Sequence, residues 1–354
     1  GLTLANGSGG TPGLSSNYKL DGGTHSFNVT KKDITFSGSR VYDGTTTVTS
    51  SDLVTNDTTS GETLAFSGSG TVSSANVQNN QSITLGSIAI ADGSGGGLAS
   101  NYNLTTGTFD ISQKWVSVGA QKIYDATTTV SSSDLNVTGE VTGESISITG
   151  TGSVTDKNVG SSKTINISGL SLSDGSHSAS NYTIGTTSFA ITRRNLSISG
   201  EKVYDGTRTV LASQIDTVNT AGGETLTISG EGSVSLPSVG TNKSITLNTL
   251  GISDGTNGTI GLASNYTLDS GSFDITTKPI TLLGSRQYDG TTDVASSDLT
   301  LIGEVSGESI SITGTGSVTD KNVGAGKTIN ATGLSLADNT SNASNYSLST
   351  GTFT

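Results

Sequence analysis

The sequence contains no cysteine and no methionine, and it has only two histidines, His25 and His177. The absence of cysteine excludes disulfides, thiolate nucleophiles and thiolate metal sites together. Two histidines cannot supply a Ser-His-Asp or Cys-His site that recurs along the chain. Because no initiating methionine is present, we expect a processed chain or a fragment of a longer one.

Charged residues are also scarce, at 13% of the chain, and the formal net charge is −12. This balance opposes binding to nucleic acid or to anionic membranes, because both are polyanions. No run of about 20 apolar residues is present, so the sequence predicts no membrane insertion in this segment. Serine, threonine, asparagine and 49 glycines take the place of charged residues, which predicts a polar but mostly uncharged surface.

What the chain does have is an internal repeat with a period of about 80 residues. The tripeptide YDG stands at 42–44, 204–206 and 288–290, and YDA stands at 124–126. Three further motifs follow in the same order in each copy, namely GE before Thr or Ser, SNY, and a late Phe after Ser or Thr. The residues that mark the four motifs are Tyr42, Tyr124, Tyr204 and Tyr288; Glu62, Glu144, Glu224 and Glu308; Tyr18, Tyr102, Tyr182, Tyr266 and Tyr346; and Phe27, Phe109, Phe189, Phe273 and Phe353.

The motif order predicts the domain boundaries. The first 30 residues contain SNY and the late Phe but no YDG, so they match only the late part of a repeat. We therefore predict the C-terminal part of a truncated repeat at 1–30, followed by complete repeats at 31–112, 113–192, 193–276 and 277–354. No spacer rich in glycine and serine separates them, which predicts little freedom at the junctions.

Every signal inside a repeat favours strands. In ITFSGSRVY, Ile34 and Phe36 alternate with polar residues, and the equivalent pairs in the other repeats are Val116 and Val118, Leu196 and Ile198, and Ile280 and Leu282. Turn signals such as DG, SG and NVG separate the short strands, and SSDL allows one helical turn at most. The predicted fold is all-β: a tandem array of Ig-like β-sandwich repeats that form an elongated rod.

The YDG and SNY motifs have a structural explanation. Asp-Gly closes tight turns, and because Ala126 replaces the glycine in one copy, we predict a type I turn that needs no positive φ. The tyrosine has the parity of the inward residues, so its ring should be buried and its hydroxyl bonded. In SNY, the asparagine should turn the chain in a left-handed conformation before a second core tyrosine.

The motifs resemble the YDG domain of very large bacterial surface proteins, including adhesins of the filamentous-haemagglutinin type. The resemblance covers nearly the whole chain and rests on KVYDGT at 202–207, GTGSVTDKNVG at 150–160 and 314–324, and NYTI at 181–184. The sequence departs from the pattern at 73–82 and at 235–240. The resemblance implies an extracellular β-rich array on the bacterial cell surface, and it implies no known catalytic residues.

We accordingly predict no enzyme and no catalytic, cofactor-binding or metal-binding residues. Calcium is the alternative, because extracellular arrays can stiffen their junctions with this ion. The candidate ligands are Glu62 and its equivalents together with Asp92, Asp174, Asp254 and Asp338. No D-x-D-x-D run supports them.

Trp115 stands where the other repeats have Asp33, Asn195 and Pro279, and we predict that it packs at a repeat junction, with a glycan contact as the alternative.

The predicted function is a non-catalytic stalk or spacer segment of an extracellular bacterial adhesin or surface fibre. The predicted partners are the neighbouring repeats of the same chain, with other copies of the protein or a cell surface beyond them. Two other hypotheses remain open. The repeats could bind a glycan or a cell surface themselves, or the chain could self-associate as a filament or matrix subunit through exposed strand edges.

Overall fold

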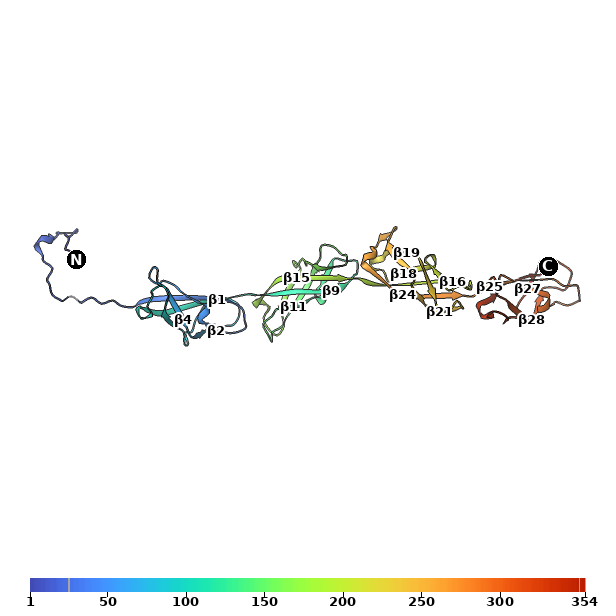
Figure 1. Cartoon of the computed structure of the whole chain (residues 1–354), viewed down its shortest axis with the longest axis horizontal. Coiled ribbons are helices and arrows are strands. Elements are labelled where there is room, and N and C mark those ends of the chain that lie inside the picture. The colour runs from blue at the N-terminus through green and yellow to red at the C-terminus, as the bar shows by residue number, and fades with distance from the viewer. Residues whose placement is uncertain (25, 350, 354) are drawn as a thin grey trace. The chain divides into compact units, whose positions relative to one another are not determined.

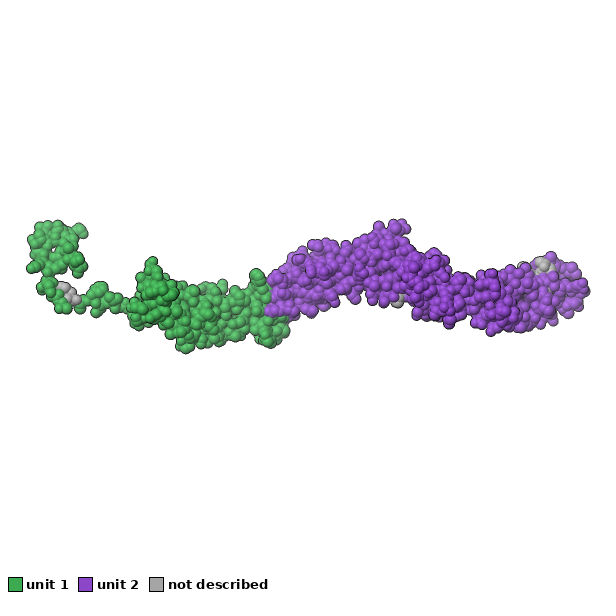
Figure 2. All heavy atoms as spheres, viewed as in Figure 1, with its two compact units in different colours: residues 1–115, 140–145, 174–183 green, residues 116–139, 146–173, 184–354 purple. Residues whose placement is uncertain are grey.

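The computed structural model describes residues 1–24, 26–349 and 351–353, so His25 lies outside the described residues. The chain divides into two compact units (Figure 2). Unit 1 comprises residues 1–115, 140–145 and 174–183, and unit 2 comprises residues 116–139, 146–173 and 184–354. Two short segments of the second repeat therefore belong to the same compact unit as the first repeat.

The first repeat begins after a segment in which the described residues form only the short 3-10 turn η1 (Ser15–Asn17). Its strands are β1 (Lys32–Val41), β2 (Thr47–Thr49), β3 (Leu53–Thr55), β4 (Leu64–Ser67), β5 (Ser69–Thr71), β6 (Gln78–Ser82), β7 (Ala89–Asp92) and β8 (Tyr102–Ser112). Its 3-10 turns are η2 (Ser50–Asp52) and η3 (Ala99–Asn101). Tyr18 and Phe27 in the preceding segment are exposed, whereas their equivalents Tyr102 and Phe109 are buried.

The later repeats follow the same order (Figure 1). The second contains β9 (Lys114–Ile123), β10 (Thr129–Ser131), η4 (Ser132–Asp134), β11 (Asn136–Thr138), β12 (Ile146–Ser153), β13 (Gly160–Lys163), β14 (Leu170–Asp174), η5 (Ala179–Asn181) and β15 (Tyr182–Thr192). The third contains β16 (Arg194–Val203), β17 (Thr209–Leu211), η6 (Ala212–Gln214), β18 (Ile215–Val218), η7 (Ala221–Gly223), β19 (Glu224–Ser229), β20 (Glu231–Val234), β21 (Gly240–Thr246), β22 (Gly251–Asp254), β23 (Thr259–Ile260), η8 (Ala263–Asn265) and β24 (Tyr266–Thr276). The fourth contains β25 (Lys278–Gly284), β26 (Asp293–Ala295), η9 (Ser296–Asp298), β27 (Leu299–Ile302), β28 (Ile310–Val318), β29 (Lys327–Asn330), β30 (Leu334–Asp338), η10 (Ala343–Asn345), β31 (Tyr346–Leu348) and β32 (Gly351–Phe353).

The first and last long strands of a repeat lie side by side and parallel, as β1 and β8 do in the order β3-β1-β8-β6. The flanking pairs β1–β3 and β6–β8 are antiparallel. The remaining strands form a second layer, in which β4 pairs with β7 and β2 pairs with β5. The two layers share one core, since the ring centroids of Phe36 on β1 and Phe66 on β4 lie 5.5 Å apart.

The predicted all-β array of tandem repeats is confirmed. The residues expected to point inward, Ile34 and Phe36 and their three equivalent pairs, are all at most 1% exposed. The SSDL segments form single 3-10 turns as predicted. The hydrophobic cores of unit 2 are not confined to single repeats. In unit 2 one hydrophobic cluster continues from Tyr204 in the third repeat to Ile310 and Tyr346 in the fourth.

Phe273 and Phe27 occupy the same motif position and offer a matched test of the core. Phe273 is fully buried and Phe27 is 88% exposed. We expect Phe273→Ala to lower the free energy of unfolding of the third repeat by about 3–5 kcal/mol, because a buried aromatic leaves a cavity. Phe27→Ala should change stability by less than about 0.5 kcal/mol. Urea unfolding measures both, and a loss of similar size in the two variants would contradict this core.

Candidate interaction site at the repeat junctions

In three of the four YDG motifs the tyrosine hydroxyl donates a hydrogen bond to a carboxylate in the next repeat. In unit 1, the Tyr42 hydroxyl donates to Glu144 Oε1 at 2.8 Å. The Tyr182 hydroxyl donates to the other oxygen of the same carboxylate, Oε2, at 2.5 Å. The rings of Tyr42 and Tyr182 meet edge to face, with centroids 5.4 Å apart and planes at 78°. One carboxylate thus joins a tyrosine from each of two repeats.

The asparagine of SNY adds a second connection beside the first. Asn181 Oδ1 accepts a hydrogen bond from the backbone N–H of Val77 at 2.9 Å. Its Nδ2 donates to Asn76 Oδ1 at 2.9 Å. Asn181 is 1% exposed, so this amide is desolvated and must be bonded to avoid a penalty. We call the set Tyr42, Glu144, Asn181 and Tyr182 a junction cluster.

Unit 2 contains two more junction clusters with the same geometry. Their YDG tyrosines donate to Glu224 Oε1 at 2.7 Å and to Glu308 Oε1 at 2.6 Å, and the ring pairs lie 5.4 and 5.5 Å apart. The asparagines accept from the backbone of the preceding repeat at 2.9 and 3.0 Å. The members are Tyr124, Glu224, Asn265 and Tyr266 in one cluster and Tyr204, Glu308, Asn345 and Tyr346 in the other.

The prediction of a buried, bonded YDG tyrosine is therefore confirmed at three of the four positions. The fourth, Tyr288, is 63% exposed. Sequence parity had placed the ring correctly, but the bonding partner belongs to the neighbouring repeat. For the Asp-Gly part of the motif, the predicted hydrogen bond of the aspartate is confirmed. Asp205 Oδ1 accepts a hydrogen bond from the backbone N–H of Thr207, as expected for a turn.

The backbone of the turn was predicted wrongly. The third residue of the motif has a positive φ in all four copies, including Ala126 at 65°. The glycine is needed for space as well as for φ. A Cβ on Gly44 would lie 2.9 Å from Glu144 Oε1 and 3.3 Å from Val141 Cγ1. The turn therefore brings its backbone against the next repeat.

Ala126 is accommodated because the repeat that receives it is smaller at this point. Val141 and Val305 stand three residues before the receiving glutamate in two clusters, but Ala221 takes that place opposite Ala126. Gly222 follows it, and a Cβ there would lie 2.9 Å from the Ala126 Cβ. The two sides of the junction thus match in size within each pair.

A buried cation behind the turn was missed by the sequence analysis. Lys202 Nζ lies 2.8 Å from Asp205 Oδ1 and donates to the carbonyls of Thr207 and Thr209. Lys122 does the same in the second repeat, and Arg40 and Arg286 pair with their YDG aspartates at 3.1 Å. The signal was available, because a basic residue stands two positions before the tyrosine in every copy.

The prediction that the SNY asparagine turns the chain in a left-handed conformation is wrong. The asparagine instead ends a 3-10 turn, as Asn181 does in η5. The aspartates proposed as calcium ligands hold this turn. Asp174 Oδ1 accepts from the backbone of Ala179 at 2.7 Å, and Asp92, Asp254 and Asp338 make the equivalent bond. Among the described residues, no group of three or more histidine, aspartate or glutamate side chains is placed to hold a metal ion.

The electrostatics of the cluster around Glu224 favour a charged glutamate between neutral tyrosines, because the pKa of Glu224 is lowered and the pKa values of Tyr124 and Tyr266 are raised. Burial alone would raise the pKa of Glu224, but hydrogen bonds from Lys157, Tyr124 and Tyr266 together lower it. Lys157 Nζ lies 2.5 Å from Glu224 Oε1. Burial, and then the hydrogen bond to Glu144, raises the pKa of Tyr42 to about 12. The charged carboxylate of Glu224 therefore accepts hydrogen bonds from a tyrosine of each of two repeats.

His177 lies near one junction cluster without a short contact to it, and Trp115 is exposed. His177 Nε2 is 3.9 Å from Glu144 Oε1, and its side chain is 45% exposed. Trp115 is 76% exposed, so the prediction that it packs at a junction is wrong. The reason is strand alternation, because Val116 on β9 points into the core and its neighbour must point outward.

The comparisons with known proteins support the repeat assignment. The family model of the YDG domain matches residues 27–109, 113–189, 192–273 and 275–353. The chain therefore belongs to the YDG domain family and consists mostly of four such domains. No curated protein matches the sequence. Among solved structures, the crystal structure of Drosophila N-cadherin EC1-4 aligns over 92% of this chain and 98% of that one, with 8% identity and a TM-score of 0.12. So low a score carries no argument. In the described part of the chain, no helix is long and apolar enough to cross a membrane.

Two glycines test the close approach at the junction. Gly206 and Gly290 have nearly equal φ values of 75° and 81°. A Cβ on Gly206 would lie 3.0 Å from Val305 Cγ1, whereas one on Gly290 would meet nothing within 4 Å. Gly290→Ala should cost only the left-handed backbone, about 1–2 kcal/mol. Gly206→Ala should cost measurably more in the free energy of unfolding. Equal losses in urea unfolding would show that Gly206 does not approach the next repeat.

High pH should separate the repeats. The pKa of Tyr42 rises from 10.0 to about 12, and that of Tyr182 also reaches about 12. A pKa raised on folding means that the neutral form is favoured. The stabilisation is therefore complete below about pH 10 and is lost as the pH rises through about 12. Ultraviolet absorbance of tyrosinate follows this step. In Glu144→Gln the titration should shift to lower pH, and an unchanged curve would remove Glu144 from the cluster.

Proposed function

We propose that the chain is a structural spacer segment of an extracellular bacterial surface protein, in which the repeats hold one another at defined junctions. The observation that carries this proposal is the hydrogen bond from three YDG tyrosines to a glutamate of the next repeat. Tyr42, Tyr124 and Tyr204 do this with the same geometry. A motif that is used three times for contact between repeats supports a mechanical role rather than a site for a soluble ligand.

The peptide connector between successive repeats is a single residue long. Only Gln113 separates β8 from β9, and only Arg193 and Thr277 separate the next two strand pairs. A one-residue connector alone would leave each repeat free to pivot about its backbone dihedrals. The junction cluster adds side-chain contacts directly beside the connector, since the backbone N–H of Tyr42 donates to the carbonyl of Ser112 at 2.9 Å, and these contacts oppose rotation about the connector. The hydrogen bonds of Asn181, Asn265 and Asn345 to backbone N–H groups add a directional constraint.

The composition suits an exposed spacer. Few charges, no cysteine and a surface of serine, threonine and asparagine make a chain that presents little chemistry of its own. The proposed location at a bacterial cell surface rests on the resemblance to the YDG domains of the surface adhesins described above. Glycan binding by the repeats would call for exposed aromatic residues that recur, and Trp115 has no aromatic equivalent in the other repeats.

Small-angle X-ray scattering on the full chain tests the proposal. A compact globule of this length has a radius of gyration of about 20 Å. Four repeats in line, each about 33 Å long with a strand of about ten residues, together with the segment 1–30 that precedes them, make a rod of roughly 140–160 Å. Its radius of gyration should be about 40–46 Å at infinite dilution. A value near 20–25 Å would overturn the spacer function.

A matched variant assigns the stiffness to the junctions. Tyr42, Tyr124 and Tyr204, all changed to Ala together, should give a chain of folded but loosely connected repeats. Its radius of gyration should be lower, and its scattering should show the broad distribution of a flexible chain. Tyr288→Ala removes the same motif residue where it is exposed, and should leave the scattering at infinite dilution unchanged. If the triple variant scatters like the unaltered chain, the connectors rather than the clusters set the stiffness.

A further inference from the structure

We propose that the outer face of the junction between the first two repeats, around Trp115, binds an uncharged oligosaccharide built of pyranose rings. Trp115 is the only tryptophan in the sequence, and its side chain is 76% exposed. The inference goes beyond the spacer function, because a spacer needs no ligand site. It concerns this one junction and not the repeat in general.

The fold does not require a tryptophan at this position. Trp115 is the second residue of β9, and the second residues of the equivalent strands are Asp33, Asn195 and Pro279. In the first repeat Asp33 accepts a hydrogen bond from Asn103 Nδ2 at 2.9 Å, so a polar residue serves the sheet here. A single exposed apolar side chain is common on protein surfaces. The surroundings of the indole ring therefore decide what it can bind.

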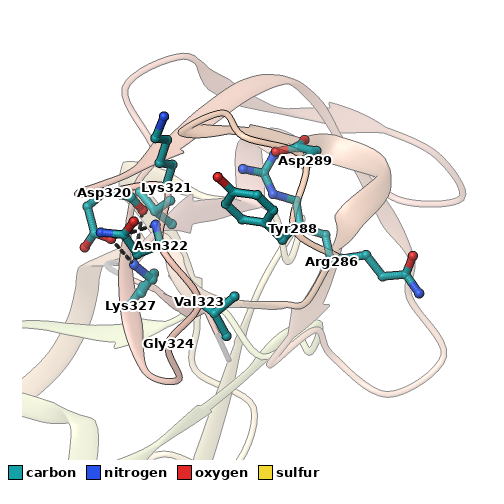
Figure 3. A pocket seen from close by; sticks show the side chains of 11 residues that line it. Arg286, Tyr288, Asp289, Asp320, Lys321, Asn322, Val323, Gly324 and Lys327 are labelled. Atoms are coloured by element: carbon teal, nitrogen blue, oxygen red, sulfur yellow. Dashed lines mark hydrogen bonds and ion pairs between the residues drawn. The ribbon is translucent and has the colours of Figure 1, made fainter.

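The hollow around Tyr288 has a different explanation (Figure 3). Its wall includes the segment 320–324, whose sequence DKNVG also stands at 156–160. There Lys157 bonds to Glu224 of the next repeat. The hollow around the tyrosine is thus lined by residues that junction clusters use, whereas the tryptophan belongs to no junction cluster.

Trp115 lies in a hollow of about 670 Å³ to which both repeats contribute. The hollow lies wholly within unit 1. Its lining residues are Val41 and Ser112 from the end of the first repeat, Gln113 from the connector, and Lys114, Trp115 and Thr183 from the second repeat.

Strand alternation turns this hollow away from the junction cluster. Val41 is 54% exposed beside the buried Tyr42, and Thr183 follows the buried Tyr182. Because successive side chains of a strand point to opposite faces, the two tyrosines face inward and the hollow faces outward. A ligand can therefore occupy the hollow without opening the bonds to Glu144.

Three polar groups in the hollow are available to a ligand. Gln113 Nε2 donates to the carbonyl of Ser180 at 3.1 Å, which orients the amide and leaves its Oε1 as an acceptor. Among the described residues, neither the Lys114 ammonium nor the Thr183 hydroxyl has a hydrogen bond or ion pair. The equivalent of Lys114 in the third repeat, Arg194, is instead engaged with a backbone carbonyl at 2.7 Å.

A pyranose ring matches this combination of an aromatic face and polar groups. Its C–H bonds can lie against the negative face of the indole ring. Its hydroxyls can donate to Gln113 and accept from Lys114 and Thr183. An apolar peptide or a lipid tail would bury these groups without partners, at a cost in free energy. The net charge of −12 disfavours nucleic acid and acidic polysaccharides, which leaves an uncharged saccharide.

The single tryptophan makes its fluorescence a direct measure of occupancy. Titration of the full chain with cellotetraose, mannotetraose and galactotetraose should shift the emission to shorter wavelength with at least one of them. Quenching by acrylamide should fall in the same titration, because the sugar covers the ring. For an open site with one aromatic ring and a few hydrogen bonds, we expect a Kd of about 0.1–10 mM.

Matched variants assign the binding to the hollow, measured by saturation-transfer NMR of the sugar because this method needs no tryptophan. Trp115→Asn introduces the residue of the third repeat and should weaken binding at least about tenfold while the circular dichroism stays unchanged. Trp115→Phe keeps an aromatic face and should lose less. Lys114→Met keeps the apolar stem but removes the donor, and should weaken binding about threefold. Phe27→Ala removes an exposed aromatic residue elsewhere and should bind like the unaltered chain.

Three results would overturn the inference. The fluorescence could stay unchanged with all three sugars up to about 10 mM, the upper end of the expected range. Trp115→Asn could bind sugar as well as the unaltered chain does, which would place binding elsewhere. A hyaluronan tetrasaccharide could bind more tightly than every uncharged sugar, which would make the ligand acidic. None of these results would alter the scattering of the chain, so the spacer function and this inference can fail separately.

Discussion

A carboxylate shared by two tyrosines is the interaction on which the arrangement of this chain depends. A buried charge is tolerated only when it is fully hydrogen-bonded, because its lost hydration must be replaced. Glu224 is 3% exposed, and its two oxygens are bonded by Tyr124 from the preceding repeat and Tyr266 from its own. Neither repeat alone can satisfy this carboxylate. The repeats are therefore defined by sequence, but the smallest complete structural unit includes the junction.

The three junction clusters share the tyrosine–glutamate bonds, the tyrosine pair and the asparagine bond to the backbone, and they differ in the bonds around this common set. The cluster around Glu224 has the additional ion pair with Lys157. In the third repeat Pro237 and Ser238 replace the lysine and asparagine of DKNVG, so Asn345 keeps its bond to the Val239 backbone without an amide partner like Asn158. Tyr204 still donates to Glu308 at 2.6 Å. Sequence change at 235–240 thus removes the lysine and the amide partner and leaves both the tyrosine–glutamate bond and the asparagine bond to the backbone, which are the common elements.

Sequence reasoning recovered the strands and the burial but not the partner, for a physical reason. Alternation of apolar residues reports which side of a strand faces a core, and it placed Ile34, Phe36 and Tyr42 correctly. The alternation does not report whether that core belongs to the same repeat or is shared with the next one. In a tandem array a contact to the same repeat and a contact to the next one have the same motif spacing, so Tyr42 and Glu144 looked like members of separate domains. Ala126 misled in addition, because a single replacement of glycine was taken to exclude a positive φ, when Ala221 and Gly222 had made room for it.

Among the described residues each junction cluster joins two successive repeats, as in a one-dimensional system whose stability is the sum of the repeats and the interfaces between them. In such a system an interface lost at one point frees the repeats on either side without unfolding them. Because the connectors Gln113, Arg193 and Thr277 are single residues, the separated halves of a cluster stay close and can re-form quickly. The cluster around Phe273 itself extends across a junction to Ile310 and Tyr346, so opening that junction would also expose part of a core. The YDG tyrosine therefore links the stability of its own repeat to that of the interface with the next.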